Sequence, residues 1–145
     1  MEIKNIDDCF KYRLLRNISP DPRKAKRSIE LSEETLKEAN SLFKFKLFNY
    51  IILNSYMAMF HSARALLYQD GIQEKSHFAL YIYLKEKYKD KISLSIINLL
   101  NIYRVERHEA MYGFEYKPQE NDALIAFKDA KLFVGKIKEI LGELK

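Results

Sequence analysis

The sequence predicts an all-α protein, an up-and-down helical bundle of about five helices, on three observations. Apolar residues recur every three or four positions through most of the 145 residues, as they do on the buried side of amphipathic helices. No segment shows the apolar–polar alternation of a strand between turn residues. Apolar residues make up 48% of a chain that has only 4 glycines and 3 prolines. This composition leaves no room for a disordered linker, and we expect one helical domain over residues 1–145.

The predicted helices, of which the first is short, cover residues 1–18, 23–43, 50–70, 75–87, 93–114 and 121–144. Pro20 and Pro22 end the first helix, because proline disfavours helical conformation in the residue before it. The second helix starts with a basic first turn around Arg23, which opposes the helix dipole and indicates an exposed start or an anion held nearby. A change in the phase of the apolar residues predicts a turn at residues 44–49.

The helix at residues 50–70 is the most apolar stretch of the chain. Its apolar residues follow the i, i+3, i+4, i+7 spacing, and Ala58, Ala63 and Ala65 allow a neighbouring helix to approach closely. Gly71 then fits the C-cap position, where glycine adopts a left-handed conformation without strain. The last predicted helix begins after Pro118.

Charge and cysteine content limit the functional classes. The net charge of +5 and a pI near 9.1 suit an anionic partner such as RNA or a nucleotide, although lysines scattered among glutamates also form an ordinary solvated surface. The single Cys9 excludes an intramolecular disulfide and a cysteine zinc site, and the 3 histidines lack metal-ligand spacing. No apolar stretch approaches the ~20 residues of a membrane span, and the N-terminus has no secretory pattern. We therefore expect a cytoplasmic protein without membrane association, metal or cofactor.

The concentrated polar chemistry of the sequence lies around Arg107. On a helix, the apolar residues near it fall within about 40° of Arg107 at roughly 100° per residue: Ile96, Leu100, Tyr103, Met111 and Phe114. A guanidinium in an apolar stripe is costly unless it meets a carboxylate, an anion or a second subunit. Arg104 and His108, at i and i+4, lie along the rim of the same stripe and can act together. The alternatives for Arg107 are anion binding and a buried ion pair with Glu106, Glu109 or Asp70 that holds a dimer.

Two groups of motifs resemble a known family. Tyr56–Leu67 has the sequence YMAMFHSARALL and is followed by Gly71 and Lys75–His77, and Arg107–Gly113 has the sequence RHEAMYG. In order and spacing they resemble the HEPN superfamily, and specifically the small stand-alone prokaryotic HEPN proteins encoded beside a minimal nucleotidyltransferase. The resemblance covers the chain from about residue 9 to residue 134.

The resemblance implies a bundle of five helices that forms a homodimer, often with the arginine motifs of the two copies facing each other. In the ribonuclease members the motif is an arginine, a polar residue, three further positions and a histidine, which cleave RNA without a metal and leave a 2′,3′-cyclic phosphate. Here His108 occupies the polar position and Tyr112 occupies the position of the catalytic histidine. Histidine exchanges protons near neutral pH, whereas tyrosine, with a pKa of about 10, does not. An active site at Arg107, His108 and Tyr112 would therefore need Arg104 with His108, or His61 or His77 brought into the site.

The remaining candidates each have a structural alternative. His61 and Arg64, spaced i and i+3 on the apolar helix, are ligand-binding candidates or a polar pair satisfied within the packing. His77, near the start of a helix, is a candidate capping residue. In paired systems that this chain resembles, the nucleotidyltransferase attaches AMP to a tyrosine near the arginine motif. Tyr112 and Tyr116 are the acceptor candidates, and the alternative for both is an interface aromatic residue.

These observations predict a homodimeric HEPN protein that is the toxin-like or regulatory partner of a nucleotidyltransferase. In one hypothesis it binds RNA or a nucleotide through the arginine-centred site at the dimer interface. The alternative is an active, metal-independent ribonuclease that uses Arg107 with a nearby histidine or tyrosine. A purely structural use of the dimer is a third.

Overall fold

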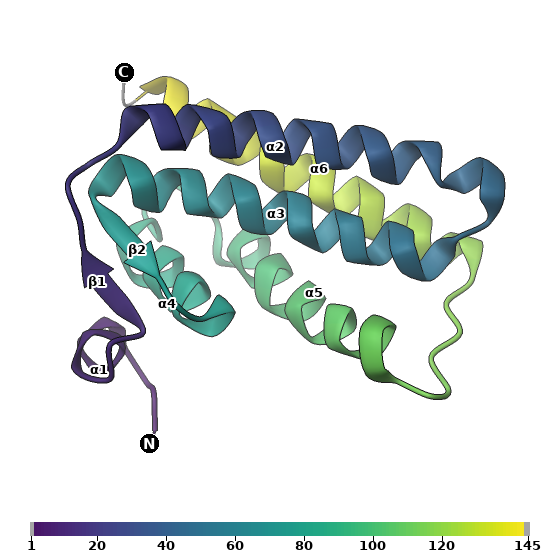
Figure 1. The fold of residues 1–145 in the computed structure, drawn as a ribbon, viewed down its shortest axis with the longest axis horizontal. Helices are drawn as coiled ribbons and strands as arrows, with labels where there is room; N and C mark the ends of the chain where they lie inside the picture. The colour runs from purple at the N-terminus through teal and green to yellow at the C-terminus, as the bar shows by residue number, and fades with distance from the viewer. Residues whose placement is uncertain (1, 144–145) are drawn as a thin grey trace.

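The structure, a computed structural model, describes residues 2–143. Its elements, in chain order, are α1 (Ile6–Lys11), β1 (Leu15–Asn17), α2 (Pro22–Ser41), the 3-10 helix η1 (Phe43–Phe45), α3 (Phe48–Asp70), β2 (Ile72–Glu74), α4 (His77–Lys87), α5 (Leu94–Tyr112) and α6 (Glu120–Glu143). The all-α prediction is confirmed. The four long helices α2, α3, α5 and α6 run alternately in opposite directions, as an up-and-down bundle requires (Figure 1).

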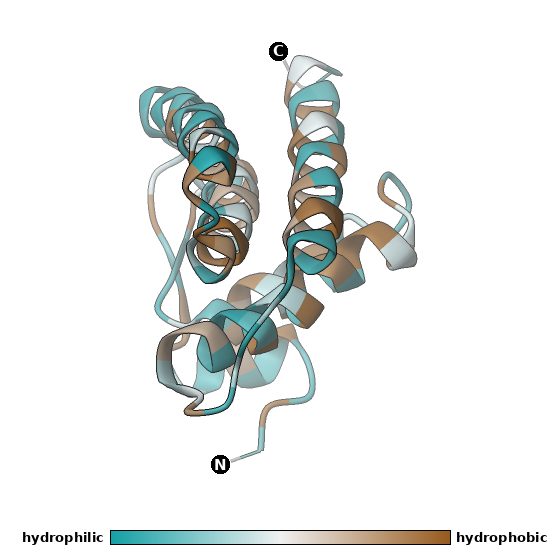
Figure 2. Cartoon of the chain, turned by 90° about the vertical axis from the view of Figure 1, so that its right-hand side faces the viewer, coloured by the Kyte–Doolittle hydropathy of each residue, from teal (hydrophilic) through white to brown (hydrophobic). Residues whose placement is uncertain are grey.

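Helix α3 is the central element of the bundle. It packs against α2, α5 and α6 along its length and contacts β2 and α4 near its C-terminal end. The alanines at 58, 63 and 65 are fully buried, which lets the neighbouring backbones approach closely. In Figure 2, hydrophobic and hydrophilic residues alternate along the long helices, as expected when each helix has a buried and a solvated side. Within residues 2–143, no helix is both long and apolar enough to span a bilayer.

A short two-stranded sheet, which the sequence did not predict, joins the N-terminal segment to the end of α3. β1 and β2 pair antiparallel, with Leu15 opposite Glu74. Arg13, at φ 58°, stands in a left-handed conformation just beyond the end of α1, so the expected helix over residues 1–18 is limited to 6–11. Each strand has only three residues, which is too short for apolar alternation to be detected.

The other boundaries agree closely with the prediction. η1 and Lys46, at φ 57°, form the expected turn at 44–49. α5 ends at Tyr112 rather than at residue 114, and the predicted end of the last helix at Leu144 lies outside the described residues. Gly71 is the C-cap of α3 at φ 78°, which confirms its predicted role.

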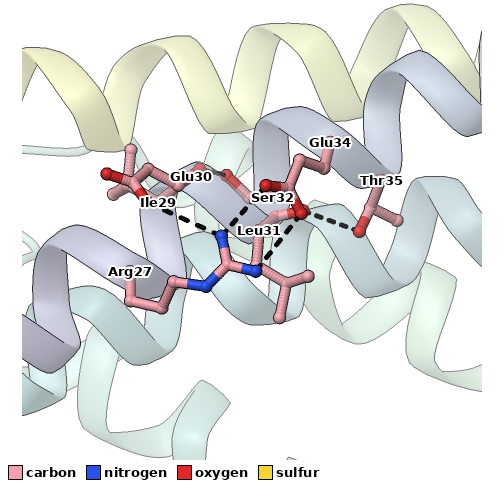
Figure 3. A network of polar contacts seen from close by, with 7 residues as sticks. All are labelled: Arg27, Ile29, Glu30, Leu31, Ser32, Glu34 and Thr35. Atoms are coloured by element: carbon pink, nitrogen blue, oxygen red, sulfur yellow. Dashed lines mark hydrogen bonds and ion pairs between the residues drawn. The ribbon is translucent and has the colours of Figure 1, made fainter.

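The basic start of α2 is exposed, which is one of the two predicted alternatives. Asp21 caps the helix by accepting a hydrogen bond from the Lys24 backbone N–H. Arg27 pairs with Glu30 and Glu34 on the same helix, with a 3.0 Å contact to Glu34 (Figure 3). These carboxylates balance the charge of Arg27 without a bound anion.

Gly71→Ala is expected to destabilise the fold by about 2 kcal/mol, because the positive φ disfavours an L side chain and the packing leaves no room for one. A Cβ at this position would lie 2.7 Å from the Ile18 carbonyl oxygen. Gly135→Ala in α6 is the matched control, because nothing lies within 4 Å of its Cβ position. It should raise stability by about 0.5–1 kcal/mol through helix propensity. Urea denaturation measures both, and an equally stable Gly71→Ala variant would contradict the cap assignment.

Candidate anion-binding site

A pocket of about 420 Å³ lies where the start of α4 meets the second half of α5. Seven residues line it: Ser76, His77, Phe78, Arg104, Val105, Arg107 and His108. The Ser76 hydroxyl accepts a hydrogen bond from the backbone N–H three residues later and so starts α4 at this point. On α5, positions 104, 107 and 108 share one helical face, which brings both predicted arginines to the same pocket.

Arg107 lies where α5 leaves the hydrophobic core. Leu100 and Tyr103, earlier on the same stripe, are buried, whereas Phe114, after the end of the helix, is completely exposed. Arg107 itself is half-buried, and it makes no ion pair or hydrogen bond with any residue from 2 to 143. The predicted alternative of an ion pair with Glu106, Glu109 or Asp70 is therefore not formed within the described chain.

Two of the carboxylates proposed for that ion pair, Asp70 and Glu106, have other partners. Asp70 accepts hydrogen bonds from the hydroxyls of Tyr83 and Tyr88, at 2.9 and 2.7 Å. Glu106 accepts one from Tyr116 at 2.9 Å. These contacts engage Asp70 and Glu106 within the bundle, and the guanidinium of Arg107 has no counterion among residues 2–143.

Arg104 is oriented by neutral groups. Its Nε donates to the Asn101 side-chain oxygen at 3.0 Å, and its guanidinium lies over the Phe78 ring at 5.3 Å from the centroid. None of the described carboxylates pairs with it. Two guanidiniums thus line one pocket, and no carboxylate among residues 2–143 neutralises them; an anion placed there would relieve the repulsion between them.

His77 joins the pocket to the core. Its Nδ1 lies 2.6 Å from the hydroxyl oxygen of Tyr56, whose side chain is fully buried in α3. The imidazole stacks on Phe60, with centroids 4.3 Å apart and planes at 22°. Burial, followed by the charges of Arg107, Arg64, Arg104 and His61, lowers the pKa of His77 to about 4. The predicted capping role is wrong, because Ser76 caps α4 and His77 occupies its first position.

His61 and Arg64 do not form the predicted polar pair with each other. Arg64 pairs with Glu74 of β2, and its guanidinium lies 4.5 Å from the Phe60 ring centroid. His61 Nδ1 is buried and has no hydrogen-bond partner in the part of the chain that the structure describes. Burial, with the Arg64 charge, lowers the pKa of His61. Because Glu74 neutralises Arg64, Arg64 is less available to an anion than the two arginines of α5.

Of the other predicted residues, His108 lines this pocket, whereas Tyr116 lines a different one together with Glu106. The rings of His108 and Tyr112 lie 5.0 Å apart, and Tyr112 is 63% exposed. Tyr116 is half-buried and its hydroxyl is held by Glu106; burial, then this contact, raises its pKa. Tyr112 therefore presents a hydroxyl to solvent, whereas Tyr116 does not.

Sequence reasoning did not assign a site role to Tyr56 or Phe78. A hydroxyl within the most apolar helix needs a hydrogen-bond partner, and this requirement was the available signal for Tyr56. Nothing in the sequence pairs Phe78 with Arg104. No group of three or more His, Cys, Asp or Glu side chains in residues 2–143 is placed to hold a metal ion.

The HEPN domain model matches residues 25–140, which is most of the chain. The protein belongs to the HEPN domain family. It is 36% identical over 122 residues to a protein of Methanocaldococcus jannaschii named "putative toxin", a match that covers 80% of this chain and 87% of that protein. It is also 29% identical over 117 residues to a UPF0332 protein of Archaeoglobus fulgidus, across 79% and 93% of the two chains. These similarities confirm the family resemblance that the motifs indicated.

Proposed function

We propose that this HEPN protein is a toxin-like partner in a two-component module and binds the phosphate of RNA or of a nucleotide at Arg107 and Arg104. The observation that carries this proposal is the pair of guanidiniums that line one pocket. Neither of them forms an ion pair with a carboxylate of residues 2–143. Guanidinium groups bind phosphate oxygens with paired, charge-assisted hydrogen bonds. The net charge of +5 favours the approach of such an anion.

The similarity to a protein named "putative toxin" supports the toxin-like role, and resemblance to stand-alone HEPN proteins supports a nucleotidyltransferase as the partner.

Exposed apolar side chains beside the pocket support a homodimer. Ile102 and Val105 are 53% and 51% exposed on α5, and Tyr112, 63% exposed, follows about two turns further along the helix. A second copy on this face would cover these side chains and bring two arginine pockets together.

Tyr112 is the acceptor that we propose for AMP transfer by the partner. Its side chain is 63% exposed and its ring lies 5.0 Å from the ring of His108, which lines the pocket, whereas the hydroxyl of Tyr116 is bonded to Glu106. Attachment of AMP at Tyr112 would place a phosphate and a nucleoside beside the pocket and compete with its ligand.

Ribonuclease activity is the second candidate, and the position of His77 favours it. The pocket contains a histidine beside Arg107 even though Tyr112 occupies the motif position. However, a pKa of about 4 leaves His77 largely neutral at pH 7, where it cannot donate a proton to a leaving group. We therefore favour binding over cleavage.

The test combines binding, cleavage and assembly on the purified full chain. Labelled single-stranded RNA and labelled ATP are titrated with the protein in excess EDTA, and the RNA is then resolved by electrophoresis. We expect salt-sensitive binding, intact RNA and a dimer by light scattering. Metal-independent production of a 2′,3′-cyclic phosphate would establish the ribonuclease instead. Failure to bind either ligand would refute the proposal.

A further inference from the structure

We propose that His77 is a fixed, neutral hydrogen-bond donor to the bound phosphate, and that Tyr56 is the positioning residue that holds it in this form. The inference rests on the proposed function, because it concerns how the same pocket recognises its anion. It assigns roles to two residues outside the arginine motif.

The hydrogen bond between Tyr56 and His77 determines which imidazole nitrogen carries the proton. The Tyr56 side chain is fully buried, and among residues 2–143 its hydroxyl has His77 Nδ1 as its hydrogen-bond partner. Burial raises the pKa of Tyr56, so the hydroxyl keeps its proton and donates it to Nδ1. An Nδ1 that accepts has no hydrogen of its own, and the neutral ring must therefore carry its hydrogen on Nε2.

The surroundings of His77 oppose a second proton on the ring. The titratable and charged groups that act on it are Arg64, His61 and Tyr56 from α3 and Arg104 and Arg107 from α5. Three of these are permanent cations, and His77 also occupies the first position of α4, where the positive end of the helix dipole lies. Ring stacking against Phe60 keeps the imidazole in a partly desolvated position.

Nε2–H is consequently available to the pocket. His77 lines the pocket beside Arg104 and Arg107, and Nε2 makes no hydrogen bond within the described residues. A neutral N–H can donate to a phosphate oxygen without adding a further positive charge near the two guanidiniums. A neutral imidazole at a helix N-terminus is a known arrangement for such a donor.

This arrangement distinguishes recognition from acid–base catalysis. A general base at His77 would need a free lone pair in the pocket, but the lone pair is on Nδ1 and accepts from Tyr56. A general acid would need the imidazolium, which the neighbouring arginines disfavour. The geometry therefore gives His77 a binding role within the proposed phosphate site.

Nuclear magnetic resonance of the ¹⁵N-labelled full chain tests both the role of His77 as a donor and the role of Tyr56 in fixing its tautomer. Long-range ¹H–¹⁵N spectra report the tautomer of each imidazole, and His77→Gln identifies the His77 signals by their absence. We expect the Nε2–H tautomer from pH 8 down to about pH 5, below the ordinary histidine pKa of ~6.5. Added inorganic phosphate should shift the Nε2 signal more than Nδ1, and Arg107→Ala should abolish that shift. In Tyr56→Phe, we expect His77 to populate both tautomers.

Two variants of His77 separate the contribution of its N–H donor to phosphate binding from the contribution of its ring. His77→Gln retains an N–H group and should bind phosphate within about threefold of the wild type, whereas His77→Phe removes the donor and should weaken binding about 10- to 100-fold. Circular dichroism checks that both variants are folded.

Three outcomes would overturn the inference. The first is that wild-type His77 titrates near pH 6.5, and the second is that its neutral ring carries the hydrogen on Nδ1. The third is that His77→Phe folds and binds phosphate as tightly as the wild type. If phosphate binding still depends on Arg107 in any of these cases, the proposed function stands and only the role of His77 is lost. If wild-type protein binds neither inorganic phosphate nor RNA, both proposals fall.

Discussion

Arg107→Ala is expected to weaken binding of RNA or nucleotide by about 100-fold without lowering the stability of the fold. A paired hydrogen bond from a guanidinium to phosphate contributes about 1.5–3 kcal/mol, and alanine removes all of it. Stability should be retained because Arg107 pairs with no described residue, so its removal leaves no buried partner unsatisfied. Loss of one of two neighbouring positive charges should even favour the folded state slightly. Titration with labelled RNA, together with urea denaturation, measures both quantities.

Two further variants show whether a loss of affinity in Arg107→Ala comes from the charge, from the geometry of the guanidinium, or from the basic surface in general. Arg107→Lys keeps the charge but not the planar pair of donors, and should recover only part of the affinity. Arg23→Ala, at the exposed start of α2, removes one positive charge away from the pocket and should change affinity by no more than about threefold. Equal losses in Arg107→Ala and Arg23→Ala would show that RNA binds by diffuse attraction to a basic surface and not at this pocket.

Arg64→Met is expected to destabilise the fold by about 2–3 kcal/mol. The variant leaves Glu74, whose side chain is only 3% exposed, without its cation. Breaking a fully buried pair costs about 3–5 kcal/mol, and the 30% exposure of Arg64 reduces that cost. Methionine keeps much of the packing against Phe60, so the loss reports mainly on the charge. Urea denaturation measures the change.

An exposed ion pair is the control for this effect. Arg27→Met breaks the contact with Glu34 on α2 and should cause no measurable change, because both side chains are more than half exposed (Figure 3). Replacing both members of the buried pair, as Arg64→Met with Glu74→Leu, should recover much of the stability that the single variant loses. If Arg64→Met alone is as stable as the wild type, burial of the Glu74 carboxylate does not depend on its ion pair with Arg64. Folded Arg64→Met should still bind phosphate, in contrast to Arg107→Ala.

Local periodicity was sufficient to predict the long helices. The spacing of apolar residues repeats over many turns in α3 and α6, and Gly71 marks a helix end that requires a positive φ. Periodicity placed Arg107 in the middle of an apolar stripe, whereas in the structure the part of that stripe beyond Arg107, at Met111 and Phe114, is exposed. Three-residue strands and the end of α1 at Arg13 carry too little repetition to be predicted in this way.

The sequence by itself determined the helical class, the family motifs and the presence of an arginine that needs a partner. Only the tertiary structure decided which groups surround that arginine. It brought His77 onto Tyr56, 21 residues earlier in the chain, paired Arg64 with Glu74, and placed the start of α4 against Arg104 and Arg107. Periodicity reports which side of a helix is buried, because burial depends on local hydrophobicity. Side-chain partners depend on how the helices pack in space, and no local pattern contains that information.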